Sequence, residues 1–206
     1  MRAVPPTSIT SPEFAEHLAE ETDTRIRALE MEHALRRHID DRLPSDPVRY
    51  QRLSDRLEDI LARLHGSWDQ LAFELDGLRD DVTAFEVHSD HLPSGEEIDL
   101  DRRTGRPIFG LLEEWLAQLT PSPRSTSTLS RHDLVRLTGV IVEVVREGVA
   151  PPHFPESPHL QETLRKSIRR TLIDAGAFDR PKATEVSTQI LDIVRANRRH
   201  YLEGPG

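Results

Sequence analysis

Apolar residues recur every three or four positions along most of this chain, and this spacing restricts the possible folds more than any other feature. Such a repeat places the apolar side chains on one face of an α-helix. One run comprises Tyr50, Leu53, Leu57, Ile60, Leu61 and Leu64, and the next comprises Trp68, Leu71, Leu75, Leu78, Val82 and Phe85. Because only a short turn around Gly66 separates the two runs, we expect an antiparallel helix hairpin.

Prolines, glycines and capping residues predict where the other helices begin and end. Ser11-Pro12 can open a first helix that continues to Leu43, where Pro44 stops it. Further helices are expected over about 108–119, 131–147, 160–175 and 181–200. The β-branched run Val140–Val145 has the length and period of a buried helix rather than a strand. The sequence therefore predicts an all-α helical bundle, with an antiparallel helix hairpin and a C-terminal set of helices joined by proline-rich loops.

Composition divides the predicted helices into three regions. Residues 1–86 hold the long first helix and the hairpin, and residues 131–206 form a C-terminal helical subdomain. Between them, 87–130 is expected to contain a mobile acidic loop, a short helix and a Ser/Thr/Pro linker, because its polar stretches cannot bury enough apolar surface to order themselves. The best domain boundary is predicted in the linker over 121–128.

The charge distribution disfavours nucleic acid as a partner. Residues 1–130 hold 15 Lys and Arg against 26 Asp and Glu, whereas 131–206 hold 12 against 10. Between Ser67 and Asp101 only Arg79 offsets eleven carboxylates, which repel a phosphate backbone. We therefore expect weak or no direct DNA binding by the chain alone.

The sequence contains no apolar stretch long enough to cross a membrane, no signal-peptide pattern at its start and no cysteine. A cytoplasmic location without a membrane partner is the expectation.

The common catalytic motifs are missing. Gly105–Gly110 has the glycine spacing of a phosphate-binding loop, but Leu111 and Leu112 follow where Lys and Ser or Thr are required. Neither lysine, Lys166 or Lys182, has the acidic residue two positions before it that a magnesium-dependent restriction nuclease uses. We expect no catalytic residue and no cofactor, and hence neither ATP hydrolysis nor DNA cleavage by the chain alone.

A metal site remains an alternative hypothesis. His132, Asp133 and Asp174, with His88 or His91 upstream, resemble in outline the ligand set of HD-type metal-dependent phosphohydrolases. Ser130-Arg131-His132-Asp133 also has the S-x-x-D form of a helix start, in which the serine and aspartate satisfy free backbone amides. The second interpretation assigns no metal to these residues.

A series of stretches along the chain forms one pattern. They are, in chain order, Glu30–Ile39, Asp46–Glu58, Trp68–Leu71, Ile141–Glu147, His153-Phe154 with Pro158, Gln161 and Leu164-Arg165, and Ile190–Asn197. In this order they resemble the C-terminal helical region of the restriction (R) subunit of type I restriction enzymes. In that family a metal-dependent nuclease and an ATP-driven DNA translocase precede this region, which helps attach the subunit to the methyltransferase core. The present chain lacks the motifs of both catalytic parts. The resemblance therefore implies attachment rather than cleavage, whether the chain is a separate protein, a gene remnant or a fragment.

The resemblance implies a protein partner, the methyltransferase (M) subunit of a type I restriction-modification complex. The polar candidates for contacting it are Arg165, Lys166, Arg169 and Arg170, which helical spacing gathers on one side. The apolar candidates are Trp115 and Phe154, which we expect to be exposed anchors. Two alternatives stay open, namely that the four basic residues form a solvated helix face and that the chain is a stand-alone helical protein-binding module.

Overall fold

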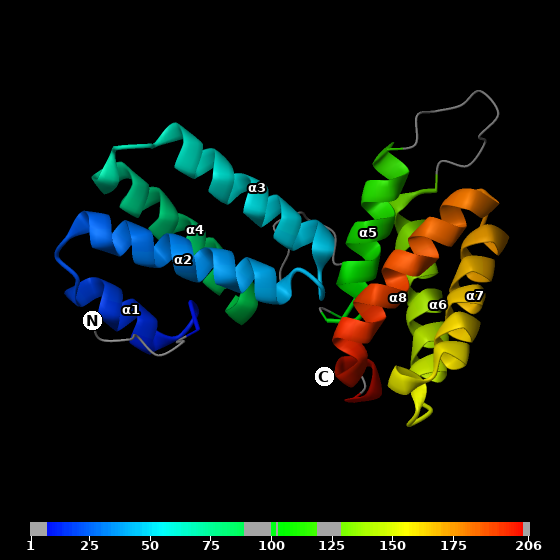
Figure 1. Ribbon diagram of the computed structural model, residues 1–206. Helices are drawn as coiled ribbons and strands as arrows, with labels where there is room; N and C mark the ends of the chain where they lie inside the picture. Colours follow the sequence, from blue (N-terminus) through cyan, green and yellow to red (C-terminus); the bar gives the residue numbers. More distant parts are fainter. Residues whose placement is uncertain (1–7, 89–99, 102, 119–128, 204–206) are drawn as a thin grey trace. The chain divides into compact units, whose positions relative to one another are not determined.

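The computed structural model describes residues 8–88, 100–101, 103–118 and 129–203, except for the side chains of residues 85–88. These residues contain helices and turns and no strand, so the predicted all-α class is confirmed (Figure 1). The chain divides into two compact units. The N-terminal unit is Met1–Leu43 with Tyr50–Glu97, and the C-terminal unit is Pro44–Arg49 with Ile98–Gly206.

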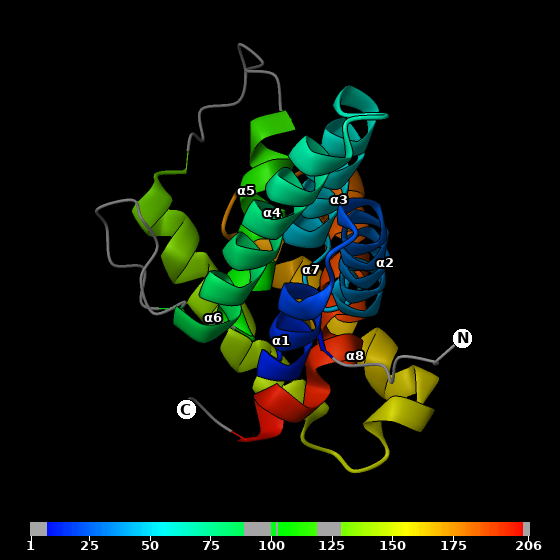
Figure 2. The same ribbon diagram turned by 90° about the vertical axis from the view of Figure 1, so that its left-hand side faces the viewer.

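Within the described residues, the N-terminal unit contains four helices (Figure 2). They are α1 (Pro12–Glu20), α2 (Thr24–Arg42), α3 (Pro47–Arg63), whose first turn belongs to the C-terminal unit, and α4 (Trp68–His88). The single long helix expected from Ser11 to Leu43 is wrong, because residues 21–23 leave the helical conformation. The carboxylate of Asp23 accepts hydrogen bonds from the backbone N–H groups of Arg25 and Ile26 and thereby starts a new helix.

The hairpin of α3 and α4 is antiparallel, as expected. Arg56 pairs with Asp81, and Arg63, further along α3, pairs with the earlier residue Glu74 of α4. The residue numbers therefore increase in opposite directions along the two helices. The apolar seam of α4 faces the core, where Leu71, Leu75, Leu78 and Val82 are buried. The backbones of α2 and α4 also lie close together, which the helical periodicity did not predict. The guanidinium of Arg27 on α2 pairs with the carboxylate of Asp76 on α4 at 3.0 Å.

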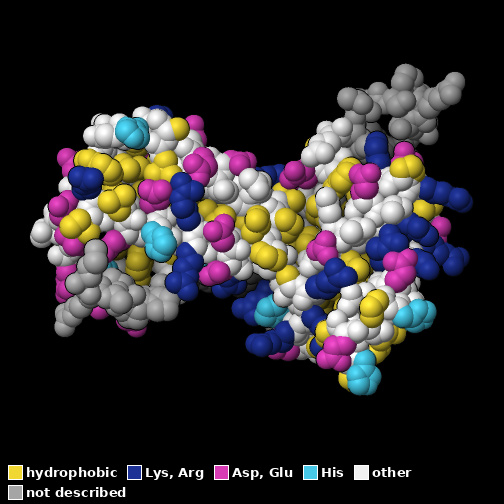
Figure 3. All heavy atoms as spheres, in the orientation of Figure 1, with side chains coloured by type: hydrophobic (Ala, Val, Ile, Leu, Met, Phe, Trp, Pro, Cys, Tyr) yellow, Lys and Arg dark blue, Asp and Glu magenta, His cyan; other side chains and the backbone are white. Residues whose placement is uncertain are grey.

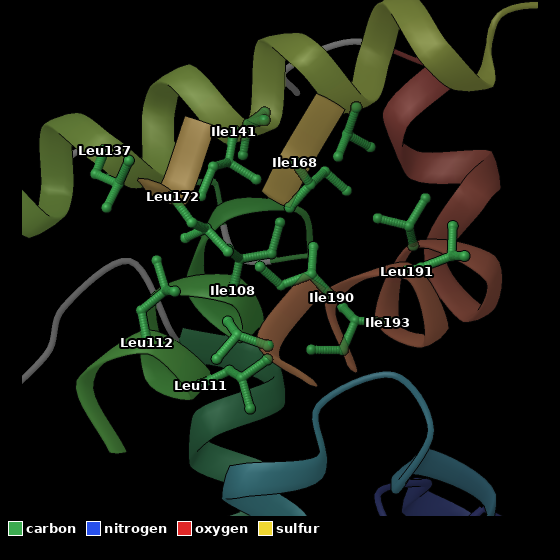
Figure 4. Close-up of a cluster of buried hydrophobic side chains, with 14 of the residues drawn as sticks. Ile108, Leu111, Leu112, Leu137, Ile141, Ile168, Leu172, Ile190, Leu191 and Ile193 are labelled. Carbon is green, nitrogen blue, oxygen red and sulfur yellow. The ribbon is translucent and has the colours of Figure 1, made fainter. Parts of the chain in front are cut away.

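The C-terminal unit is built around a larger core. Its helices are α5 (Gly105–Gln118), α6 (Arg131–Val149), the short 3-10 helix η1 (Phe154–Glu156), α7 (Pro158–Asp174) and α8 (Arg180–Glu203). Figure 4 shows apolar side chains from α5, α6, α7 and α8 meeting in this core, among them Ile108, Leu112, Ile141, Ile168, Leu172 and Ile190. The helices expected in this part of the chain are therefore present.

The division into regions differs from the prediction. The short helix placed in the region 87–130 is α5, and its residues Ile108, Phe109, Leu111 and Leu112 are buried in the C-terminal core. The linker at 121–128 therefore joins two helices of one unit rather than two domains. Most of the expected acidic loop, at 89–99, and the linker from 119 to 128 lie outside the described residues.

Long-range hydrogen bonds organise the C-terminal unit around α8. The buried side-chain amide of Asn197 donates to the carbonyl oxygen of Ser45 at 2.8 Å, so it holds the segment Pro44–Arg49 in this unit. The hydroxyl of Tyr201 donates to the carbonyl oxygen of Thr104 at 3.0 Å, just before α5. The guanidinium of Arg198 donates to the carbonyl oxygen of Val149 at the end of α6. Each bond satisfies a backbone carbonyl that a helix or turn leaves free.

Candidate protein-binding surface

The turn from α7 to α8 determines where the basic side chains of the C-terminal unit meet. The N–H of Ala177 donates to the carbonyl oxygen of Leu172 and that of Gly176 to Ile173, which is the Schellman pattern at a helix end. Gly176 has φ +67°, a left-handed conformation that glycine adopts without steric cost. Three residues after Gly176, the Asp179 carboxylate accepts a hydrogen bond from the N–H of Lys182 near the start of α8. The chain thus reverses within a few residues, and α8 returns along α7.

This reversal forms a shallow pocket in which positive charge predominates, called the α7–α8 groove below. It is lined by Lys166, Arg169, Arg170, Ile173, Asp174, Arg180 and Thr184. Figure 3 shows Lys and Arg side chains gathered on the part of the C-terminal unit that carries α7 and the beginning of α8. Three of the four basic candidates from the sequence therefore lie around one pocket, together with Arg180.

Two of these guanidinium groups, those of Arg169 and Arg180, make no hydrogen bond or ion pair within the part of the chain that the structure describes. The Arg169 charge acts only at longer range, where it contributes to the lowered pKa of the Glu162 carboxyl. Lys166 lies 3.7 Å from the carboxylate of Glu162, and Arg170 lies 3.5 Å from that of Asp174. Both ion pairs are long and exposed to solvent, so each pair contributes little attraction. The groove therefore offers Arg169 and Arg180 to an incoming anionic group.

Arg165 is not a lining residue of the groove. Its guanidinium donates two hydrogen bonds to the carboxylate of Glu162, at 2.8 Å and 2.7 Å. This bidentate bond lowers the pKa of the Glu162 carboxyl and raises the pKa of the Arg165 guanidinium. Arg165 lies one turn before Arg169 on α7. The Glu162 carboxylate already accepts hydrogen bonds from the Arg165 guanidinium. Arg165 therefore lies on the same helix as Arg169 but outside the lining of the groove.

Of the two apolar candidates, Phe154 is fully buried, with 0% of its surface exposed, so its prediction as an exposed anchor is wrong. The side-chain amide of Gln161 donates to the carbonyl oxygens of Phe154 and Pro155 and fixes the turn that points Phe154 into the core. A phenylalanine among prolines carries no periodic signal that would have indicated this burial.

Trp115 is half-buried, and its indole N–H donates to the side-chain oxygen of Gln189 at 2.7 Å. This bond joins α5 to α8, so the indole is partly engaged within the unit. Trp115 is consequently a weaker candidate for partner contact than the groove residues.

The residues of the alternative metal site have other partners. The Ser130 hydroxyl accepts a hydrogen bond from the N–H of Asp133 and donates to its carboxylate at 2.7 Å, as the S-x-x-D interpretation requires. This bond is the main reason why the pKa of Asp133 is lowered. Asp174 pairs with Arg170. Among the described residues, no group of three His, Asp or Glu side chains lies close enough together to hold a metal ion. This finding covers His132 as well as Asp133 and Asp174. The side chain of His88 and the whole of His91 lie outside these residues.

Sequence reasoning missed Arg180 and Thr184 because they meet α7 only across the Gly176 turn. The one sequence signal for their position is Gly176, because a glycine after a helical run indicates that the chain turns. Helical spacing cannot predict which residues of two different helices lie together.

Comparisons of this chain with protein-family models, with curated proteins and with solved structures find no match. Among the described residues, every helix is too short or too polar to cross a lipid bilayer.

Proposed function

We propose that this chain is a non-catalytic helical interaction module that binds a protein partner through the α7–α8 groove. The supporting observation is the pair of guanidinium groups, those of Arg169 and Arg180, that line one pocket and make no hydrogen bond or ion pair to any residue that the structure describes. Arginines in this state form new ion pairs without first breaking old ones, and positive charge on one face accelerates encounter with an acidic surface.

The proposed partner is the methyltransferase (M) subunit of a type I restriction-modification complex, in the cytoplasm. The basis for this choice is the order of stretches that resemble the C-terminal region of the R subunit. In this proposal the module attaches to the methyltransferase core and needs no cofactor, while nuclease and translocase activities reside in other polypeptide segments.

Capture of the M subunit by the immobilised chain tests this proposal. The variant R169E/R180E should associate at least about tenfold more slowly than wild type at low salt, because both guanidinium contacts become repulsive. The difference should shrink as salt screens the charges. Circular dichroism should be unchanged, since neither Arg169 nor Arg180 belongs to the buried core.

The matched control is R136E/R199E, which changes the net charge equally at two exposed arginines outside the groove. This control should associate like wild type. Equal capture of wild type and R169E/R180E would overturn the assignment of the groove. Magnesium-dependent DNA cleavage or ATP hydrolysis by the chain, in a preparation without contaminating enzymes, would overturn the non-catalytic assignment.

A further inference from the structure

The α7–α8 groove combines separated positive charges with one apolar side chain. Arg169 comes from α7 and Arg180 from the first turn of α8, so different helices carry the two guanidinium groups that make no hydrogen bond or ion pair among the described residues. Ile173 is the only apolar residue among the described residues that line the groove, and it is half-buried. A ligand that fills this groove therefore has to provide both negative charge and an apolar group.

We propose, building on the function proposed above, that the groove binds an acidic peptide segment of the partner with carboxylates on both sides of one apolar side chain. Arg169 and Arg180 each take one carboxylate, for which the forked guanidinium is geometrically suited. The apolar side chain of the segment contacts Ile173. The segment thus makes two ion pairs around a water-excluding contact, the usual arrangement of polar contacts around an apolar anchor.

The charge count of the groove favours a peptide over a nucleic acid. Asp174 lies in the lining 3.5 Å from Arg170, so its carboxylate offsets one of the four positive charges there. This small basic surface suits a short segment with a few carboxylates, whereas a duplex requires a basic surface that neutralises several phosphates in a row. The N-terminal unit of the same chain, with 10 Lys and Arg against 21 Asp and Glu, adds a long-range repulsion that grows with the negative charge of the ligand, so it opposes a duplex more than a short acidic peptide.

Fluorescence polarisation with the full chain and labelled probes tests this inference. The first probe is a blocked peptide with two glutamates on each side of a single leucine. A second peptide has glutamine in place of every glutamate, and a third has serine in place of the leucine. A short DNA duplex is the fourth probe. Wild type should bind the glutamate–leucine peptide at least about tenfold more tightly than either altered peptide.

Variants of the chain assign the binding to the groove. R169Q/R180Q should lose about tenfold in affinity for the glutamate–leucine peptide, whereas the control R136Q/R199Q should bind like wild type. I173S should weaken binding of that peptide several-fold and leave binding of the serine peptide unchanged, provided that circular dichroism shows intact helices. This second variant separates the apolar contact from charge attraction.

The possible outcomes separate this inference from the proposed function. If no peptide binds while capture of the M subunit still requires Arg169 and Arg180, the inference fails and the proposed function stands. If the peptide binds in the groove but R169E/R180E still captures the M subunit like wild type, the inference stands and the proposed function fails. If the DNA duplex binds as tightly as the peptide and loses affinity in R169Q/R180Q, the groove is a phosphate site and the inference is overturned.

Discussion

At the residue scale, the buried hydroxyl of Tyr201 couples the end of α8 to the turn before α5. Removal from water raises the pKa of Tyr201 well above that of an exposed tyrosine, and the negative charge of Asp101 adds to this effect. A raised pKa means that the folded state holds the phenolic proton more tightly than the unfolded state does. The stabilisation is therefore complete below the unfolded pKa of about 10 and is lost as the pH rises above it.

The variant Tyr201→Phe should be less stable than wild type by about 1 kcal/mol near pH 8, because the carbonyl oxygen of Thr104 loses its donor. The gap should narrow or reverse above about pH 10, since only wild type must then deprotonate a buried hydroxyl on this residue. Urea unfolding followed by circular dichroism at several pH values measures both effects. If the free energies of unfolding of the two proteins change with pH in parallel, burial of the Tyr201 hydroxyl does not make stability depend on pH.

The Ser130 cap predicts a second residue-scale effect. Ser130→Ala should lower the free energy of unfolding by about 1 kcal/mol, because the N–H of Asp133 loses its acceptor. The pKa of the Asp133 carboxyl should rise toward its usual value in this variant, since the Ser130 hydroxyl is the main cause of its lowering. A lowered carboxyl pKa stabilises the fold at neutral pH and loses its effect as the pH falls through that pKa. NMR titration measures the shift.

Ser157 provides the matched control, because its hydroxyl caps α7 in the same way by accepting from the N–H of Leu160. Ser157→Ala should cost a similar free energy of unfolding without changing the titration of Asp133. A normal Asp133 pKa in wild type would show that the Ser130 bond does not form in solution.

At the element scale, the crossing of α6 and α7 depends on a glycine. A Cβ atom on Gly148 would lie 2.6 Å from Cδ1 of Leu164, whereas one on Gly139 of the same helix would have nothing within 4 Å. Leu164 is itself 3% exposed, so it has little room to move aside. The helices therefore approach more closely at Gly148 than an alanine permits.

The two glycines should respond oppositely to alanine. Gly139→Ala should raise the free energy of unfolding by about 0.5–1 kcal/mol, because alanine favours a helix over glycine. Gly148→Ala gains the same helix preference, but its added methyl group overpacks the crossing of α6 and α7, which typically costs about 1–3 kcal/mol. The Gly148→Ala variant should therefore be less stable than both wild type and Gly139→Ala. Urea midpoints measure this difference. Equal gains at both positions would show that α6 and α7 do not cross at Gly148.

At the scale of the whole molecule, the two units differ in charge. The N-terminal unit carries 10 Lys and Arg against 21 Asp and Glu, and the remaining residues carry 17 against 15. A net charge far from zero destabilises a compact state by self-repulsion, and salt screens that repulsion. We expect added salt to raise the urea midpoint of the N-terminal unit more than that of the C-terminal unit.

Each unit contains one tryptophan, Trp68 in the first and Trp115 in the second, so fluorescence can follow the units separately. The variant Trp115→Phe reports the N-terminal unit, and Trp68→Phe reports the C-terminal unit. Midpoints compared at low and high salt within each variant give the two salt slopes. Equal slopes would mean that the units unfold as one body or that self-repulsion in the N-terminal unit is negligible.

The sequence by itself determined the all-α class and the positions of most helices. Helical periodicity, a capping residue such as Ser130 and a terminating residue such as Gly176 act within a few residues of one another, so they can be read along the chain. Asp23 was missed because the apolar spacing continues across it, although its carboxylate could equally well cap a helix. The basic character of α7 was also readable, since Lys166, Arg169 and Arg170 lie close together in the sequence.

Only the tertiary structure decided which of these residues share a surface. Arg180 joins Arg169 through the turn at Gly176, Glu162 occupies Arg165, and Gln161 fixes the turn that buries Phe154. The close approach of α2 to α4 and the placement of α5 in the C-terminal core have the same origin. Most of these features depend on contacts between segments that are distant in sequence, and the Glu162–Arg165 bond depends on competition between local partners. Neither kind of interaction leaves a periodic pattern in the sequence.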